Sequence, residues 1–140
     1  MVAAFGVAFL SFVALALVPA VFADSPLGTV SLLLFSGLCH QLPERSFACD
    51  GHAMAICHRC TGIYLGLGAG ALLSLVRPVD PTRRALLAWA VVPMGAQVML
   101  GWIFPALDRP ELRVATGLLT GVIGGLVAGS ALLRARRAAP

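Results

Sequence analysis

Residues 57–76 have the sequence CHRCTGIYLGLGAGALLSLV, an apolar run that begins with a pair of cysteines and carries a small residue at every fourth position. The run has the length of about 20 residues that an α-helix needs to cross a bilayer. Small side chains four residues apart leave a flat helix face, which lets a second helix approach closely within lipid. We therefore expect a transmembrane helix over 57–76 that packs tightly against another helix and begins at the cysteines.

The composition of the whole chain places it in a membrane. Of its 140 residues, 59% are hydrophobic and 11% are charged, too few polar side chains to cover a soluble protein of this size. We predict an all-α integral membrane protein that forms one membrane domain over residues 1–140, with no separate soluble domain. The expected transmembrane helices, about four in number, cover residues 1–23, 57–76, 85–107 and 114–133.

Two segments near the N-terminus differ in length and in what they predict. Residues 1–23 are long enough to span the bilayer, although Val21-Phe22-Ala23 resembles a signal-peptidase site and cleavage there is an alternative. The absence of a basic region before the apolar run argues against cleavage. Residues 27–38 are apolar but too short to span, so we expect a re-entrant or interfacial segment.

The predicted helix 114–133 repeats the glycine spacing of 57–76. Each series predicts one flat helix face, because glycine lets two backbones approach closely. Such faces serve either as packing seams within the chain or as contact surfaces of a homo- or hetero-oligomer. The glycines that form the two predicted faces are Gly62, Gly66, Gly70, Gly117, Gly121 and Gly125.

The basic residues predict the orientation of the chain. All ten are Arg, the net charge is +4, and they flank apolar runs instead of covering a polar face, which argues against nucleic-acid binding. Arginines close to membrane helices usually stay cytoplasmic. We therefore expect the C-terminal tail in the cytoplasm and the loop 39–60 on the outer face of the cell membrane. The arginines behind this prediction are Arg77, Arg83, Arg84, Arg134, Arg136 and Arg137.

The reactive side chains gather in that loop. All four cysteines and all three histidines fall between residues 39 and 60. Cys57 and Cys60 lie three residues apart at a helix start, where the backbone favours thiolate, and such a pair can chelate a metal. Tetrahedral zinc prefers sulfur and nitrogen ligands. We predict a transition-metal site, most simply for zinc, formed by Cys39, Cys57, Cys60 and a histidine from His40 or His52.

Other interpretations of the same residues stay open. Cys57 and Cys60 also suit a membrane thiol-disulfide oxidoreductase, with Cys39 as a resolving thiol. An outer compartment favours structural disulfides as well, and Cys49 fits such a bond better than a metal site. A non-enzymatic transporter or assembly subunit is a further class. Haem attachment and nucleotide binding have no motif here, since Thr61 stands where the haem motif needs histidine.

Two polar positions lie away from the cysteines. Gln97 falls near the middle of the predicted helix 85–107, where we expect it to form a packing hydrogen bond. Arg113 starts the fourth helix and is placed to face the motif, or to pair with Glu111 as an interfacial ion pair.

The order and spacing of the residues around the cysteines resemble a family of small prokaryotic membrane proteins known as domain of unknown function 2085. The resemblance rests on CHQ at 39–41, ERSF at 44–47, GH at 51–52, CxRCTGIY at 57–64 with Gly66, and more weakly on Arg113 with TG at 116–117 and Gly121. It implies an architecture and a set of hallmark residues but no activity. Similar proteins often carry Asp in the third helix, near the position of Gln97. The residues expected to support the site are Gln41, Glu44, Arg45, Ser46, Arg59, Thr61, Tyr64 and Arg113.

Overall fold

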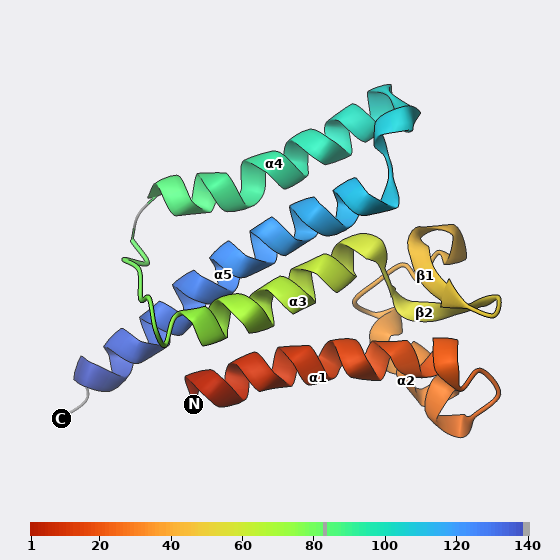
Figure 1. Ribbon diagram of the computed structural model, residues 1–140, viewed down its shortest axis with the longest axis horizontal. Helices are drawn as coiled ribbons and strands as arrows, with labels where there is room; N and C mark the ends of the chain where they lie inside the picture. Colours follow the sequence, from red (N-terminus) through yellow and green to blue (C-terminus); the bar gives the residue numbers. More distant parts are fainter. Residues whose placement is uncertain (83, 139–140) are drawn as a thin grey trace.

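A computed structural model describes residues 1–82 and 84–138, so Arg83 of the expected cytoplasmic loop lies outside the described residues. The predicted all-α membrane fold is confirmed, with a small β-hairpin added inside the loop 39–60 (Figure 1). The elements are α1 (Val2–Val21), α2 (Pro26–Ser36), the 3-10 turn η1 (Pro43–Arg45), β1 (Ser46–Cys49), β2 (His52–Cys57), α3 (His58–Leu73), α4 (Arg84–Ile103), the 3-10 turn η2 (Pro105–Leu107) and α5 (Pro110–Ala138).

Three of the helices, α1, α4 and α5, are long and apolar enough to cross a membrane. The predicted helix 57–76 is shorter than expected: α3 has 16 residues and gives way to a turn at Ser74. Its glycines replace large apolar side chains because α3 packs between α1 and α5 and exposes little surface to lipid. The small residues of α3 therefore suit its interior position between two helices.

Prolines account for where the last two helices end and begin. The helix predicted over 85–107 ends at Ile103, since Pro105 cannot continue it and opens η2 instead. The helix predicted over 114–133 starts earlier, at Pro110, because proline suits the first position of a helix. It also runs further, through the arginine tail to Ala138.

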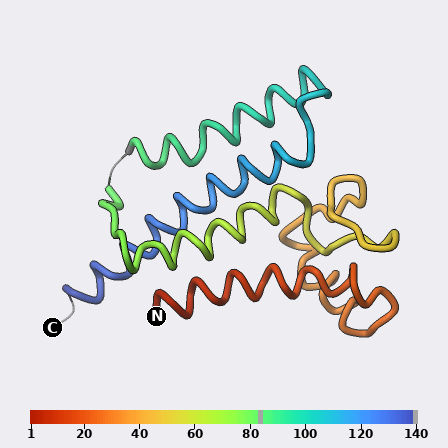
Figure 2. The backbone as a smooth tube through the Cα atoms, in the orientation of Figure 1, coloured from red at the N-terminus to blue at the C-terminus, as the bar shows by residue number. Residues whose placement is uncertain are grey.

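The glycine faces of α3 and α5 meet each other along a parallel helix pair (Figure 2). A Cβ added to Gly62, Gly66 or Gly70 would overlap the backbone of α5, and one added to Gly121 or Gly125 would overlap the backbone of α3. This reciprocal fit brings the two backbones into direct contact, as expected for small residues at a spacing of four. Both faces are buried within one chain, so these glycines pack the helix bundle itself.

A second glycine contact joins α3 to α1, on the side away from α5. Gly68 lies against Leu10, and Gly6 of α1 lies against Leu72. Beyond this contact, the apolar core closes over the cysteine end of the molecule, where Phe35 of α2 and Ile56 of β2 are fully buried. The core therefore connects the helix bundle to the hairpin.

The hairpin turns at Asp50 and Gly51. Both residues have positive φ angles, 49° and 84°, as a two-residue turn of the type that matches strand twist requires. Cys49 pairs with His52 beside the turn, and Ser46 pairs with Cys57 at the other end. The hairpin therefore delivers Cys57 to the start of α3 and carries His52 away from it.

The two ends of the bundle differ in character. The α3–α4 connection and the C-terminal part of α5 lie at one end, where Arg134 binds Asp80, and the hairpin and α2 lie at the other (Figure 1). The short helix α2 exposes Leu27 and Leu33, which fits the interfacial segment expected over 27–38. The α3–α4 connection with Arg77 and the arginines of the C-terminal tail thus lie at the end of the bundle opposite the cysteines.

Candidate metal centre

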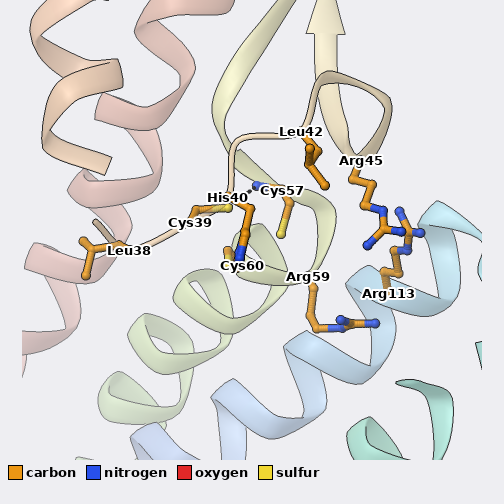
Figure 3. A pocket seen from close by; sticks show the side chains of 9 residues that line it. All are labelled: Leu38, Cys39, His40, Leu42, Arg45, Cys57, Arg59, Cys60 and Arg113. Carbon is orange, nitrogen blue, oxygen red and sulfur yellow. Dashed lines mark hydrogen bonds between the residues drawn. The ribbon is translucent and has the colours of Figure 1, made fainter. Parts of the chain in front are cut away.

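Three of the four cysteines converge at the start of α3. The Sγ atoms of Cys39, Cys57 and Cys60 all lie within 4.8 Å of one another. Cys39 is buried and comes from the loop after α2, Cys57 ends β2, and Cys60 lies in the first turn of α3 (Figure 3). Chain segments separated by 18 residues are therefore brought to one point by the hairpin.

Hydrogen bonds fix the backbone around these sulfurs. The Cys57 amide donates to the Cys39 sulfur over 3.2 Å, and the Thr61 hydroxyl donates to the Cys57 carbonyl over 3.1 Å. Gln41 holds the loop from the other side, since its amide nitrogen donates to the carbonyls of Leu32 (2.8 Å) and Ala55 (3.1 Å). Gln41 has a positive φ of 51°, so the loop turns sharply directly after the Cys39-His40 pair.

The electrostatic surroundings favour a thiolate at Cys57. The pKa of Cys57 is lowered to about 5, mainly by a side-chain hydrogen bond from Cys60 and further by backbone and Cys39 contacts, against an opposing effect of burial. Cys57 is also the N-cap residue of α3, where the positive end of the helix dipole favours negative charge. A deprotonated sulfur is the form that binds metal ions and attacks disulfides.

A cavity of about 300 Å³ opens beside the sulfurs. It combines thiols with three guanidinium groups, from Arg45, Arg59 and Arg113, and no carboxylate is among the described residues that line it (Figure 3). Leu38 and Leu42 supply apolar wall. The full lining is Leu38, Cys39, His40, Leu42, Arg45, Cys57, Arg59, Cys60 and Arg113.

Side-chain hydrogen bonds of Arg59 and Arg113 link α3, α4 and the start of α5. Arg59 donates to the Gln97 side-chain oxygen over 2.6 Å, and the Gln97 amide nitrogen donates to Asp108 over 3.4 Å. Arg113 donates to both carboxylate oxygens of Asp108, from Nε over 2.6 Å and from Nη2. Gln97 thus forms the packing hydrogen bond predicted from the sequence.

Asp108 is the functional candidate that the sequence interpretation missed. The expected partner of Arg113 was Glu111, but the carboxylate that binds it is Asp108, because η2 folds Asp108 back toward α4. Hydrogen bonding from Arg113 lowers the pKa of Asp108 to about 2. The signal available in the sequence was an acidic residue two positions before the helix-starting Pro110, near the positive end of the helix dipole.

The structure does not bring every predicted residue to the sulfurs. His40 lies on the rim of the cavity and is exposed, and it is outside the group of three close sulfurs. His52 lies five residues from Cys57 along β2, a distance of about 17 Å at the usual rise per strand residue. The four cysteines are free in the structure, and Cys49, beside the turn, is exposed.

The remaining supporting residues hold the surroundings of the site. Ser46 is buried and donates to the Leu42 carbonyl over 3.0 Å, which anchors the start of β1. Tyr64 packs edge-on against Phe12 and is part of the apolar wall behind the cysteines. Glu44 is exposed in η1.

Comparison with known proteins gives a family match over the same region. A family described as "Predicted membrane protein (DUF2085)" matches residues 39–127, which run from the first cysteine of the cluster to the middle of α5. An uncharacterised protein of Methanocaldococcus jannaschii is 35% identical over 92 residues, covering 63% of this chain and 59% of the relative. An uncharacterised protein of Methanothermobacter thermautotrophicus is 36% identical over 93 residues, covering 63% of this chain and 81% of the relative. No solved structure matches the chain.

Proposed function

Because the chain belongs to the DUF2085 family of predicted membrane proteins, we propose that it is a bilayer protein that holds one transition-metal ion, zinc, through Cys39, Cys57 and Cys60. The observation that carries the proposal is the close approach of three sulfurs from separate segments, within 4.8 Å of one another. Thiolates are preferred zinc ligands, and a group this close suits one ion.

Three protein sulfurs leave one position of a tetrahedral site for another ligand. A structural zinc site takes four protein ligands, whereas a catalytic site keeps one position for water or substrate. His40, on the rim of the cavity, is the side chain that would close the site. The cavity of about 300 Å³ beside the sulfurs favours the open form, in which the ion faces a space large enough for a small molecule.

Metal analysis of the purified protein tests the proposal. We expect about one zinc ion per chain in the detergent-purified wild type and in the Cys49→Ser variant, and none in Cys57→Ser, because structural zinc is lost with a ligand. The Cys49 variant is a matched control, since it removes an exposed cysteine outside the cluster. Zinc content that is equally low in all three proteins would overturn the proposal.

Thiol counting on the same samples separates metal from disulfide. With zinc bound, Cys49 should react with a maleimide at once, while the three clustered thiols become reactive only after chelation and denaturation. A chain with clustered disulfides would instead need a reductant before those thiols react. Failure of both treatments to release the three thiols would contradict the metal site.

The second candidate is a thiol-disulfide oxidoreductase. It is favoured by the position of Cys57 at the N-cap of α3, half exposed in the cavity, with Cys60 one turn further along the helix. The Cys57 thiolate would attack a partner disulfide and release one partner thiolate; the Cys60 thiolate would then displace the second partner sulfur. The partner gains two electrons and the chain is left with a Cys57–Cys60 disulfide. Trapping of a mixed disulfide by Cys60→Ser, but not by Cys57→Ser, is the expected result, and zinc-loaded protein that traps none would exclude it.

We also propose that the cysteine end faces outward and the arginine end faces the cytoplasm. The grouping of Arg77, Arg134 and the tail at one end of the bundle supports this orientation under the positive-inside rule. Exposed Cys49 provides a natural label. A membrane-impermeant maleimide added to intact cells should modify the wild type and not Cys49→Ser; labelling only after the membrane is opened would reverse the orientation.

A further inference from the structure

We propose that the cavity beside the cysteines binds an oxyanion of the phosphate type, held by Arg59 and Arg113 with Arg45 at its opening. The oxyanion would occupy the open side of the proposed metal site. The proposal rests on the proposed function only in placing the ligand beside the three sulfurs. The carrying observation is a space of about 300 Å³ whose described lining has three arginines and no carboxylate. Planar guanidinium groups match phosphate and carboxylate oxygens with paired hydrogen bonds.

Two of the arginines keep hydrogen-bond donors for such a ligand. Arg59 uses Nη2 for Gln97, while its Nε is buried without a partner. Arg113 is 8% exposed and uses Nε and Nη2 for Asp108, which leaves Nη1 without a partner in the described part of the chain. A buried donor without an acceptor is costly, by about 1–3 kcal/mol. Arg59 Nε is such a donor, and an oxyanion between Arg59 and Arg113 would accept hydrogen bonds from both guanidinium groups.

The helix arrangement points the same way. Because α3 and α5 run parallel, their N-termini meet at the cavity, and each carries an arginine in or near its first turn. Cations are unfavourable at this end of a helix, where the dipole is positive, and anions are favourable. The first turn of α3 contains no acidic residue. The first turn of α5 carries Glu111, and Asp108 binds Arg113 there, so the positive potential at the cavity comes mainly from the start of α3 and from the arginines.

Two of the three cavity arginines have no ion-pair partner among the described residues. Asp108 neutralises Arg113 in an ion pair. No carboxylate pairs with Arg45 or Arg59 among residues 1–82 and 84–138. Arg45 and Arg59 therefore bring positive charge to the cavity without an ion-pair partner, which favours an anionic ligand.

Phosphate chemistry could reach the cavity from two sources, a free phosphate compound or the headgroup of an anionic lipid. For the first, inorganic phosphate is titrated into detergent-purified protein by calorimetry. For the second, the protein is isolated from phosphatidylglycerol-containing nanodiscs and retained lipid is measured by native mass spectrometry. Saturable phosphate binding assigns the free compound, and retained lipid without phosphate binding assigns the headgroup.

Charge-matched variants decide whether the binding belongs to the cavity. Arg59→Gln should weaken binding about tenfold or more, since it removes a charged donor, and Arg45→Gln should weaken it a few-fold. Arg109→Gln is the control: this arginine is exposed, does not line the cavity and changes the net charge equally, so binding should stay within about twofold. Because Arg45 is exposed, its variant keeps the test valid if Arg59→Gln does not fold.

The outcomes separate this inference from the metal site, because zinc is measured on every sample. Zinc-loaded protein that binds neither phosphate nor anionic lipid overturns the oxyanion site and keeps the metal site. Zinc-free protein that binds phosphate through Arg59 overturns the metal site and keeps the oxyanion site. An equal loss of binding in Arg109→Gln and Arg59→Gln also overturns the inference, since it would show attraction by overall charge alone.

Discussion

The helices α3 and α5 begin with similar sequences, but the charge of the arginine near each start is neutralised differently. α3 and α5 run parallel, each places an arginine near its start, and each continues with glycine at a spacing of four. At the start of α5, Asp108 binds Arg113 through both carboxylate oxygens. At the start of α3, Arg59 meets only the neutral side chain of Gln97, and its neighbours are Cys57 and Cys60.

The arginine at the start of α5 therefore has a counter-charge within the chain, whereas the arginine at the start of α3 has none. Asp108 supplies the counter-charge of Arg113, so the positive charge at the start of α5 is neutralised. Arg59 keeps its charge beside a cluster of thiols, an arrangement that costs stability unless thiolates, a metal or an external anion share the site. The packed seam below is the same for both helices, and therefore the chemistry of the molecule is decided by the side chains at their starts.

The largest expected effect comes from separating the two helix starts. Gly121→Leu would force a side chain into the backbone of α3, where even a Cβ overlaps the Ile63 carbonyl oxygen. We expect a loss of about 3 kcal/mol or more in the free energy of unfolding, at the upper end for overpacking, together with loss of bound zinc. Thermal unfolding in detergent and metal analysis provide the two measurements.

Gly95→Leu is the matched control for that seam. Gly95 lies in α4, and no atom lies within 4 Å of an added Cβ. The same substitution should therefore change the melting temperature little and leave zinc in place. Similar losses in both variants would mean that glycine serves helix flexibility in general and not the α3–α5 contact.

The next effect comes from removing the counter-charge of α5. Asp108→Asn keeps the shape of the side chain but leaves Arg113, 8% exposed, without an anionic partner. We expect a loss of about 1–3 kcal/mol in the free energy of unfolding, because a largely buried charge loses its ion pair. The more positive cavity should bind phosphate more tightly. Unchanged stability would show that Asp108 does not stabilise the fold by neutralising Arg113.

The sequence predicted the parts of this comparison that depend on spacing. The apolar lengths gave α1, α4 and α5, and the fourfold glycine spacing anticipated the faces that meet between α3 and α5. The cysteines were also found from their spacing, since Cys57 and Cys60 lie one helical turn apart. These features are local, so a single chain contains enough information to predict them.

The sequence did not predict the contacts that form where the chain reverses direction, at the hairpin and after α4. Asp50-Gly51 was the available turn signal for the hairpin, and without the hairpin His52 appeared as near to the cysteines as His40. The pairing of Asp108 depends on α4 ending before Pro105, which moves this carboxylate to Gln97 and Arg113. Such contacts depend on the exact residue at which an element ends, the least certain feature of a sequence-based prediction.

A smaller effect should follow from giving Arg59 a counter-charge of its own. Gln97→Glu places a carboxylate where the neutral amide oxygen accepts from Arg59, which makes the start of α3 resemble that of α5. Phosphate affinity should fall about tenfold, or about 1.4 kcal/mol, because one cavity charge is neutralised. Gln97→Met is the control, since it removes the hydrogen bond without adding charge. An equal loss in both variants would assign the effect to packing.

The smallest expected effect is a pH dependence of stability, which tests whether Asp108 stabilises the start of α5 through its charge. Hydrogen bonding from Arg113 lowers the pKa of Asp108 from 3.8 to about 2, so the folded chain releases this proton more readily than the unfolded chain. The stabilisation is therefore fully present above about pH 4 and is lost as the pH falls toward 2, with a magnitude of about 1 kcal/mol for a carboxylate that remains partly exposed. The difference between the melting temperatures of wild type and Asp108→Asn isolates the contribution of this one group. That difference should shrink between pH 5 and pH 2; a constant difference would mean that Asp108 acts through its shape and neutral hydrogen bonds, and not by neutralising the charge of Arg113.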